Sequence, residues 1–157
     1  GPNMDGESIY QLLAEEKVTF TAAVPTVWLM LMQHLETNKL DLPDLETVTI
    51  GGSAVPRVML EKFERDYSVS VKHAWGMTEM SPLGTITGLK AGMENMTFDE
   101  QMDIKVKQGR PPYLMEIKIT DDDCRRITAN LVVFQWKPFM GADRASFLLF
   151  NKQAVDV

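Results

Sequence analysis

Cysteine and histidine are scarce in this sequence. Among its 157 residues are one cysteine, Cys124, and two histidines, His34 and His73. A single cysteine cannot form a disulfide within the chain, and so few cysteines and histidines leave little to build a transition-metal site. We therefore expect a protein of a reducing compartment, with the cytoplasm as its natural location. Cys124 follows three aspartates in a polar stretch, and we interpret it as a bystander.

Long apolar runs are also missing. The longest, such as Val27 to Met32 and Leu131 to Phe134, are far shorter than the roughly 18 apolar residues that a membrane-spanning helix needs. The first residues do not show a basic segment followed by an apolar one, which is the pattern of a secretory signal. The sequence therefore predicts a soluble protein without a membrane span.

Positive charge is in the minority. Sixteen lysines and arginines face 22 aspartates and glutamates, which gives a formal net charge of -6. This sign of charge repels polyanions, so nucleic acid is excluded as the default partner. The length and a hydrophobic content of 45% fit a single domain, or part of one, over residues 1–157. The sequence leaves the oligomeric state open, with a homodimer among the options.

Apolar periodicity divides residues 1–80 into alternating helices and strands. In the first strand, for example, the apolar Val18, Phe20 and Ala22 alternate with polar residues. Strands that alternate with helices form βαβ units, which predict an α/β fold with a mainly parallel sheet and right-handed crossovers. The expected helices span 8–16, 26–36 and 56–67, and the expected strands span 18–23, 47–50 and 69–75.

The rest of the chain is less regular. Periodicity fades from Ser81 to Arg110, and we expect residues 81–113 to be a long loop region of the kind that is usually kept for function. Residues 114–157 are β-rich, with strands expected over 114–120 and 127–136. The last stretch, 137–157, shows no clear period.

Three segments are expected at one edge of the parallel sheet. They follow the first three strands and comprise Val24 to Thr26, Gly51 to Ala54, and Trp75 to Glu79. The carboxyl ends of parallel strands are where open α/β sheets bind ligands. These segments contain glycines for close backbone approach, an aromatic plane, a hydroxyl and a carboxylate, which are the groups that a nucleotide with Mg²⁺ requires.

Other familiar signatures fit poorly. The run Gly51 to Val55 is similar to a G-x-S-x-G nucleophile elbow, but Val55 stands in place of the last glycine, so a hydrolase that uses Ser53 is only a distant alternative. Neither a P-loop nor a G-x-G-x-x-G fingerprint is present. His34 is expected on a helix surface, and His73 is expected to be a hydrogen-bonded buried residue rather than a general base.

Three stretches resemble successive segments of the adenylate-forming acyl-CoA synthetases, particularly the fatty-acyl-CoA ligases. They are Val18-Thr-Phe-Thr-Ala-Ala-Val-Pro-Thr-Val-Trp28, Val48-Thr-Ile-Gly-Gly-Ser-Ala-Val-Pro56 and Ala74-Trp-Gly-Met-Thr-Glu-Met-Ser-Pro82. Their order and spacing fit, and the third stretch is highly specific for that family. The resemblance covers residues 1 to about 123, and after that point the chain diverges.

The resemblance implies roles for individual residues. It places Gly52, Ser53 and Ala54 along the adenine. It packs Trp75 against the base and shapes the base pocket with the backbone of Ala74 and Gly76. It gives Thr78 phosphate contacts and makes Glu79 the Mg²⁺ ligand, so that Thr78 and Glu79 are the candidate catalytic pair. It puts Val24, Thr26 and Trp28 at the border of the acyl pocket.

The implied reaction joins a carboxylic acid to CoA. The carboxylate attacks the α-phosphate of ATP, pyrophosphate leaves, and the CoA thiol then captures the acyl-adenylate. The substrates are therefore a small carboxylic acid, ATP and CoA, and Mg²⁺ is the metal. Catalysis of this kind relies on positioning and charge stabilisation, so the lack of a protein nucleophile is no objection.

The chain also lacks parts of the family pattern. We do not find the family's Ser/Thr/Gly-rich phosphate loop, the T-G-D segment that holds the ribose, or the C-terminal lid with its lysine. We therefore expect a central slice of the large N-terminal domain of an acyl-CoA ligase, weak or inactive as an isolated chain. The alternative is a non-catalytic interaction module that keeps the fold.

Overall fold

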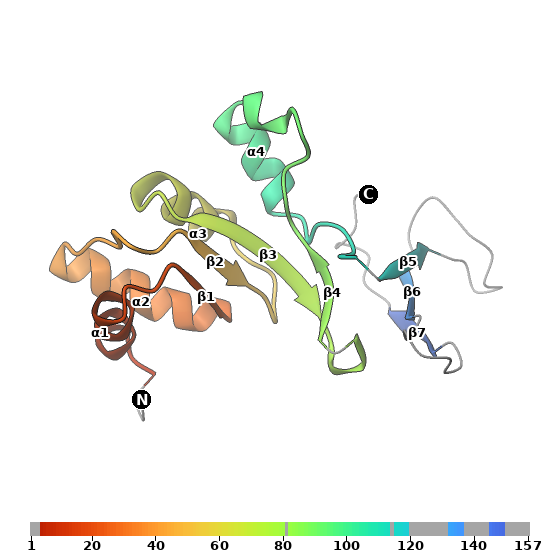
Figure 1. The fold of residues 1–157 in the computed structure, drawn as a ribbon, viewed down its shortest axis with the longest axis horizontal. Coiled ribbons are helices and arrows are strands. Elements are labelled where there is room, and N and C mark those ends of the chain that lie inside the picture. The colour runs from red at the N-terminus through yellow and green to blue at the C-terminus, as the bar shows by residue number, and fades with distance from the viewer. Residues whose placement is uncertain (1–3, 81, 114, 120–131, 137–144, 150–157) are drawn as a thin grey trace.

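The computed structural model describes residues 4–80, 82–113, 115–119, 132–136 and 145–149. In these residues the strands form two sheets, one in the order β1-β2-β3-β4 and one in the order β5-β6-β7. Figure 1 shows the first sheet with its helices and the second sheet toward the C-terminus. The mixed α/β class predicted from the periodicity is confirmed.

Residues 4–76 are built of alternating helices and strands. β1 pairs with β2 and β2 pairs with β3, and both pairs are parallel. The direction follows from the helices between them, because parallel neighbours need a crossover connection. The elements are α1 (Gly6–Glu15), β1 (Phe20–Ala23), α2 (Pro25–Asn38), β2 (Thr47–Ile50), α3 (Arg57–Glu61), the π-helix η1 (Lys62–Asp66) and β3 (Ser70–Gly76).

The helix ends follow from local chemistry. Asp5 caps α1, and its carboxylate accepts the backbone N–H of Ser8 at 2.8 Å. Pro25 opens α2, where the first turn needs no N–H donor. α2 ends at Asn38, and Lys39, which caps this end, takes up the left-handed conformation with φ of 54°. These ends set the direction in which α2 leaves the carboxyl end of β1.

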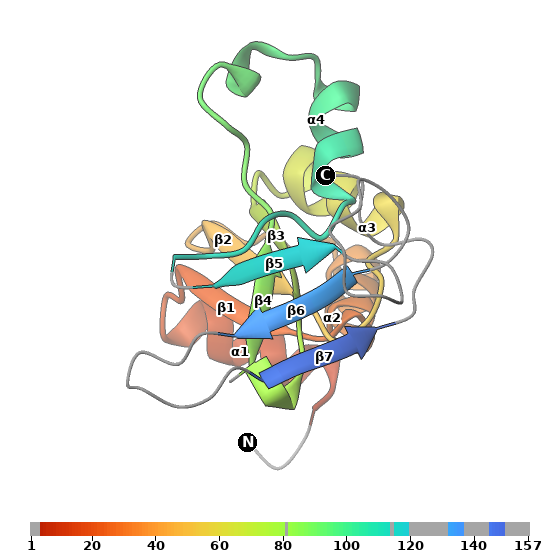
Figure 2. The same ribbon diagram turned by 90° about the vertical axis from the view of Figure 1, so that its right-hand side faces the viewer.

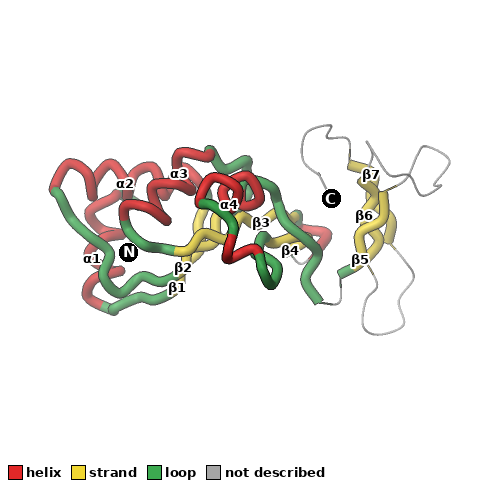
Figure 3. Tube along the Cα trace, turned by 90° about the horizontal axis from the view of Figure 1, so that it is seen from above, coloured by secondary structure: helices red, strands yellow, loops and turns green. Residues whose placement is uncertain are grey.

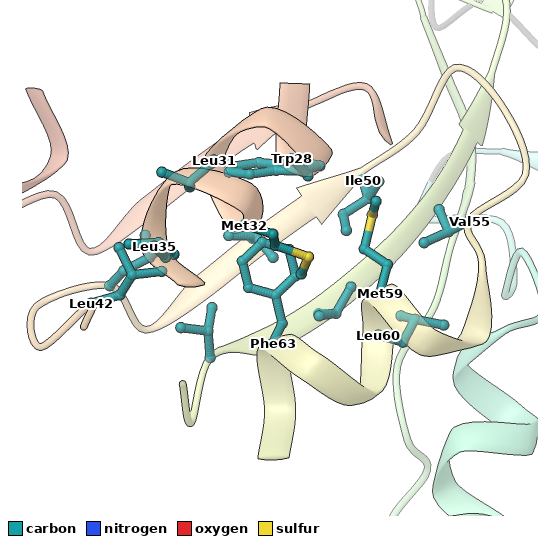
Figure 4. Packing of buried hydrophobic residues seen from close by; sticks show 14 of the residues in the cluster. Trp28, Leu31, Met32, Leu35, Leu42, Ile50, Val55, Met59, Leu60 and Phe63 are labelled. Carbon is teal, nitrogen blue, oxygen red and sulfur yellow. The ribbon is translucent and has the colours of Figure 1, made fainter. Parts of the chain in front are cut away.

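The core lies between the helices and one face of the first sheet. Val48, Ile50 and Val71 share this face and are fully buried, and α2 and α3 lie on the same side of β1 and β2 (Figure 3). Trp28 of α2 meets Phe63 of η1 edge to face, with ring centroids 5.4 Å apart (Figure 4). Truncating a buried aromatic residue to alanine costs about 3–5 kcal/mol, so this pair fixes both helices over the sheet.

The other face of β1 is open. Phe20 is 59% exposed and Ala22 is exposed, whereas Thr21 and Ala23 on the helix side are half-buried. The alternation in the sequence correctly indicates a strand. It does not reveal which of the two faces the helices cover.

Residues 81–113, predicted from the sequence to be a long loop region, contain regular structure. They include β4 (Leu83–Ile86), which pairs antiparallel with β3, the 3-10 turn η3 (Met93–Asn95) and α4 (Phe98–Lys105), and the 3-10 turn η2 (Thr78–Met80) lies just before them. α4 begins with a capping box, in which Thr97 and Glu100 bond to each other's backbone N–H. The expectation of an irregular connection is therefore wrong over these residues.

The second sheet is antiparallel throughout its described strands. β6 (Val132–Trp136) pairs with β5 (Glu116–Ile119) on one side and with β7 (Ala145–Leu149) on the other (Figure 2). β5 and β6 lie within the strands expected over 114–120 and 127–136. β7 falls in the stretch where no period was found. Cys124 lies outside the described residues.

Candidate functional site

The three segments chosen from the sequence meet at the carboxyl edge of β1, β2 and β3. The parallel registers pair Ala23 with Ile50 and Ile50 with His73, so β1 and β2 end level with His73, and β3 continues past them to Gly76. Figure 1 shows the ends of β1, β2 and β3 on the same side of the sheet. The segment after β2 therefore begins between the end of β1 and the last residues of β3.

Two glycines let these segments come close. A Cβ at Gly51 would lie 2.8 Å from the carbonyl oxygen of Ala74, nearer than a carbon and an oxygen can approach. A Cβ at Gly52 would lie 3.0 Å from Cγ1 of Val24, and Gly52 has a φ of 85°, which disfavours any side chain. Gly51 thus packs against β3, and Gly52 packs against the start of α2.

The residues of the middle segment face solvent. Ser53 and Ala54 are exposed, and Val55 is buried in the core. The segment therefore presents its hydroxyl and its small side chain outward, with Val55 as an anchor. This is an accessible position for contact with a small molecule.

The third segment continues from β3 into a short turn. Ala74 is 8% exposed, Trp75 is half-buried and Gly76 is exposed. The backbone N–H of Met77 donates to the carbonyl of Pro82 at 2.8 Å, which closes the turn between β3 and β4. The exposed Thr78 begins the 3-10 turn η2, and Glu79 follows it in the same turn.

The indole of Trp75 rests on β4. A Cβ built at Gly84 would lie 2.6 Å from Cε3 of Trp75 and 2.9 Å from the sulfur of Met80. Gly84 and Met80 are both buried. Sequence reasoning missed these two supporting residues, although an isolated glycine in a strand is a known sign of close approach by another group.

The three residues predicted to border an acyl pocket differ in exposure. Val24 is 46% exposed and Thr26 is exposed, both at the start of α2. Trp28 is 1% exposed, and its Nε1–H donates to the carbonyl of Ala23 at 3.1 Å. Its surroundings are those of a core residue, and its assignment to the acyl pocket stays a prediction.

His73 supports β3 from beneath the site. It is 2% exposed, its Nδ1 lies 3.0 Å from the carbonyl oxygen of Val106, and its backbone N–H donates to Oγ1 of Thr87. Burial lowers the pKa of His73, and the hydrogen bond to Val106 opposes this shift. The expectation of a buried, hydrogen-bonded histidine is confirmed.

A buried ion pair also holds β3. Glu64 of η1 accepts the backbone N–H of Val71 at 2.9 Å and pairs with the ammonium of Lys105 in α4. Both charged side chains are about nine-tenths buried. Removing one partner of a buried pair costs about 3–5 kcal/mol because the other charge is left uncompensated. α4 and η1 are therefore linked at the strand that carries Trp75.

A second ionic contact joins α3 to α4 at the surface. Arg57 lies 2.6 Å from Glu61 and 2.9 Å from Asp99, and it also pairs with Asp103. The hydrogen bond that Arg57 donates to the carboxylate of Glu61, together with the one it donates to Asp103, raises the pKa of Arg57. These contacts are solvent-exposed, so they orient α4 more than they stabilise it.

The opposite edge of the sheet carries a different surface. A concavity there is lined by residues that precede β2 and β3, including Asp41, Glu46, Asp66 and Tyr67. Burial together with Asp66 and Asp41 raises the pKa of Tyr67. Negative charge at this edge repels phosphate, so it suits a nucleotide poorly.

No group of three or more His, Cys, Asp or Glu side chains is placed to hold a metal ion among the residues that the structure describes. Mg²⁺ is usually bound by one or two carboxylates together with substrate phosphates, rather than by a cage of protein ligands. A single carboxylate at Glu79 is compatible with that chemistry, and its role remains a prediction.

The described helices include none long and apolar enough to cross a membrane.

Comparison with solved structures identifies the fold. The N-terminal domain of FACL13 from Mycobacterium tuberculosis matches with a TM-score of 0.69 and 22% identity, over 87% of this chain and 33% of that one. The anthranilate CoA ligase AuaEII, solved with anthranoyl-AMP, matches with a TM-score of 0.68 and 15% identity, over 87% of this chain and 25% of that one. The fold is that of the N-terminal domains of acyl-CoA ligases.

Sequence comparison identifies the family. The model described as AMP-binding enzyme matches residues 1–131. The chain is 42% identical over 123 residues to 3-methylmercaptopropionyl-CoA ligase of Ruegeria lacuscaerulensis, covering 78% of this chain and 23% of the relative. It is 41% identical over 127 residues to medium-chain-fatty-acid–CoA ligase of Ectopseudomonas oleovorans, covering 81% and 23%. The chain belongs to the AMP-binding enzyme family and spans about a quarter of the length of these relatives.

Proposed function

We propose that this chain forms the adenine side of the ATP site of an AMP-forming acyl-CoA ligase. The observation that supports this most strongly is the packing at the carboxyl edge, where Gly51 abuts Ala74 of β3 and Gly52 abuts Val24 at the start of α2. Ligands bind at this edge in open α/β sheets. The relatives named above act as CoA ligases, and AuaEII was solved with an acyl-AMP at its site.

In this proposal different residues of the chain contact different parts of the nucleotide. Ser53 and Ala54 line the adenine, and Trp75 packs against the base. The backbone of Ala74 and Gly76 shapes the pocket, Thr78 contacts phosphate, and Glu79 holds Mg²⁺. Bound there, Mg²⁺ would neutralise charge on the phosphates.

The whole enzyme would activate a carboxylic acid with ATP and pass the acyl group to CoA. Val24 and Thr26 are exposed at the start of α2 and Val24 lies beside Gly52, so an acid held there would be close to the nucleotide. A fatty acid is the substrate class we favour, because the relatives include medium-chain and long-chain fatty-acid–CoA ligases. The chain covers about a quarter of such enzymes, so we expect it to hold only part of the site.

The test is nucleotide binding by wild type and by Glu79→Gln. We expect wild type to bind ATP with Mg²⁺ weakly, and Glu79→Gln to raise the dissociation constant about tenfold, or about 1.4 kcal/mol. The amide keeps the size of the side chain and removes the charge that Mg²⁺ prefers. Calorimetric titration with ATP, and with AMP in the absence of Mg²⁺, provides the measurement.

The controls separate the site from general charge effects. Glu94→Gln removes an exposed carboxylate from η3, so it should leave ATP affinity unchanged. AMP binding should be insensitive to Glu79→Gln. Equal ATP affinity for wild type and Glu79→Gln would contradict the role of Glu79 and favour the interaction module. ATP–pyrophosphate exchange with a fatty acid should be weak, and robust exchange by the chain alone would contradict a partial site.

A further inference from the structure

Gly84 occupies an unusual position beneath Trp75. It is buried in β4, and a Cβ there would lie 2.6 Å from Cε3 of the indole. Carbon atoms that are not bonded to each other approach to about 3.5 Å, so no side chain fits while the indole stays in place. The edge of the six-membered ring that contains Cε3 therefore lies close against the α-carbon of Gly84.

Met80 completes this support. Its sulfur would lie 2.9 Å from the same Cβ position, and Met80 is 4% exposed. The thioether therefore lies beside the indole, an arrangement in which sulfur and an aromatic ring attract each other. Met80 belongs to η2, the turn that also contains Thr78 and Glu79. The contact thus connects the ring to the turn proposed to meet the phosphates.

The register of the two strands provides the space. β3 and β4 pair Trp75 with Thr85 and Gly76 with Leu83, so the register shifts between Trp75 and Gly76 and Gly84 is the extra residue. A bulge of this kind re-aims the neighbouring side chains. Here it brings the bare α-carbon of Gly84 under the ring.

We propose that Gly84 is a positioning residue for the nucleotide base. Without a side chain at this position the indole of Trp75 lies back on β4, and this sets how much room remains for adenine. With alanine there, the ring must move away from β4, toward the space where the base would pack. The inference rests on the proposed role of Trp75 beside the adenine.

The test compares Gly84→Ala with Gly88→Ala. A Cβ at Gly88 meets no atom within 4 Å, so this variant makes the same chemical change in the connection after β4 without touching the indole. We expect Gly84→Ala to raise the dissociation constant for AMP about tenfold. The reason is that stacking of a base on an aromatic ring strengthens binding by a factor of that order. Gly88→Ala should bind as wild type does.

A double-mutant cycle separates the indole from the strand. Trp75→Phe removes the larger ring system, so Gly84→Ala should cause little further loss in that background. Alanine is in itself better suited to a strand than glycine, so the loss we expect is steric, through the ring and through the sulfur of Met80 beside it. An equal loss of AMP affinity in both backgrounds would overturn the proposal.

Fluorescence gives a readout that needs no nucleotide. We expect Gly84→Ala to shift the tryptophan emission to longer wavelength and to increase quenching by acrylamide, and both changes should disappear in the Trp75→Phe background. If wild type binds no AMP but these changes are seen, the proposed function fails and the support of Trp75 by Gly84 stands. Unchanged fluorescence would overturn the proposal itself.

Discussion

Gly52 illustrates how a single residue can serve two loops. Its positive φ suits the turn after β2, and its bare α-carbon accepts the side chain of Val24 from the start of α2. The sequence marks Gly51 and Gly52 as a turn with room for a ligand, and the structure adds the reason for each glycine. Trp75 was likewise identified as an aromatic plane, but its support by Gly84 was not, because that contact depends on a bulge that the sequence pattern does not reveal.

At the scale of single residues, His73 is predicted to make the stability of the fold depend on pH. Because burial lowers its pKa below the usual value of about 6.5, the unfolded chain takes up a proton at a higher pH than the folded chain does. Stability from this residue is therefore complete above pH 6.5 and declines as pH falls toward the lowered folded-state pKa. His73→Gln, which keeps a donor for Val106, should lose less stability on acidification.

Urea unfolding at pH 7 and pH 5.5 measures this difference. We expect the free energy of unfolding to decrease less between these two pH values for His73→Gln than for wild type. His34→Gln serves as the control for removing a histidine outside the core. A decrease as steep in His73→Gln as in wild type would show that His73 does not carry the effect.

At the scale of elements, the first three strands and their helices were predictable and α4 was not. β2 was predicted to the residue over 47–50, because β-branched residues run into a glycine turn. α4 has only eight residues and few apolar ones, so periodicity gave little signal. Its clearest sign is the capping box of Thr97 and Glu100, a local hydrogen-bond pattern rather than a periodic one.

At the scale of elements, the capping box of α4 is predicted to contribute to the stability of the fold. Thr97→Ala removes the hydroxyl that accepts the Glu100 backbone N–H, and it should lower the free energy of unfolding by about 1 kcal/mol. The effect should reach β3, because α4 carries Lys105 and is followed by Val106, both of which hold that strand. Chemical unfolding together with amide hydrogen exchange over β3 would measure both effects.

Thr97→Ser is the matched control. Serine keeps the capping hydroxyl, so its stability should stay close to that of wild type. The Thr97 hydrogen bonds also lower the pKa of Glu100, so this contribution is present above its usual pKa and is lost in acid. Serine and alanine variants of equal stability at pH 7 would contradict the cap as the origin of the effect.

At the scale of the whole molecule, the topology of the first sheet places the segments proposed to bind the nucleotide at one edge. Parallel pairing of β1, β2 and β3 places the segment that begins at Gly51 and the segment that begins at Trp75 at the same edge of the sheet, although they are more than twenty residues apart in the sequence. The sequence predicted this edge because βαβ units leave little choice of direction. The second sheet was only partly predictable, since the region of β7 showed no period.

Backbone amide chemical shifts during an AMP titration test this claim most directly. We predict that the largest chemical-shift changes cluster at residues 51–54 and 74–78. Residues 66–69, which precede β3 at the acidic opposite edge of the sheet, should change little. Such a map would assign the base to the carboxyl edge even if affinity is weak. Changes centred on the opposite edge, or none at millimolar AMP, would contradict the account.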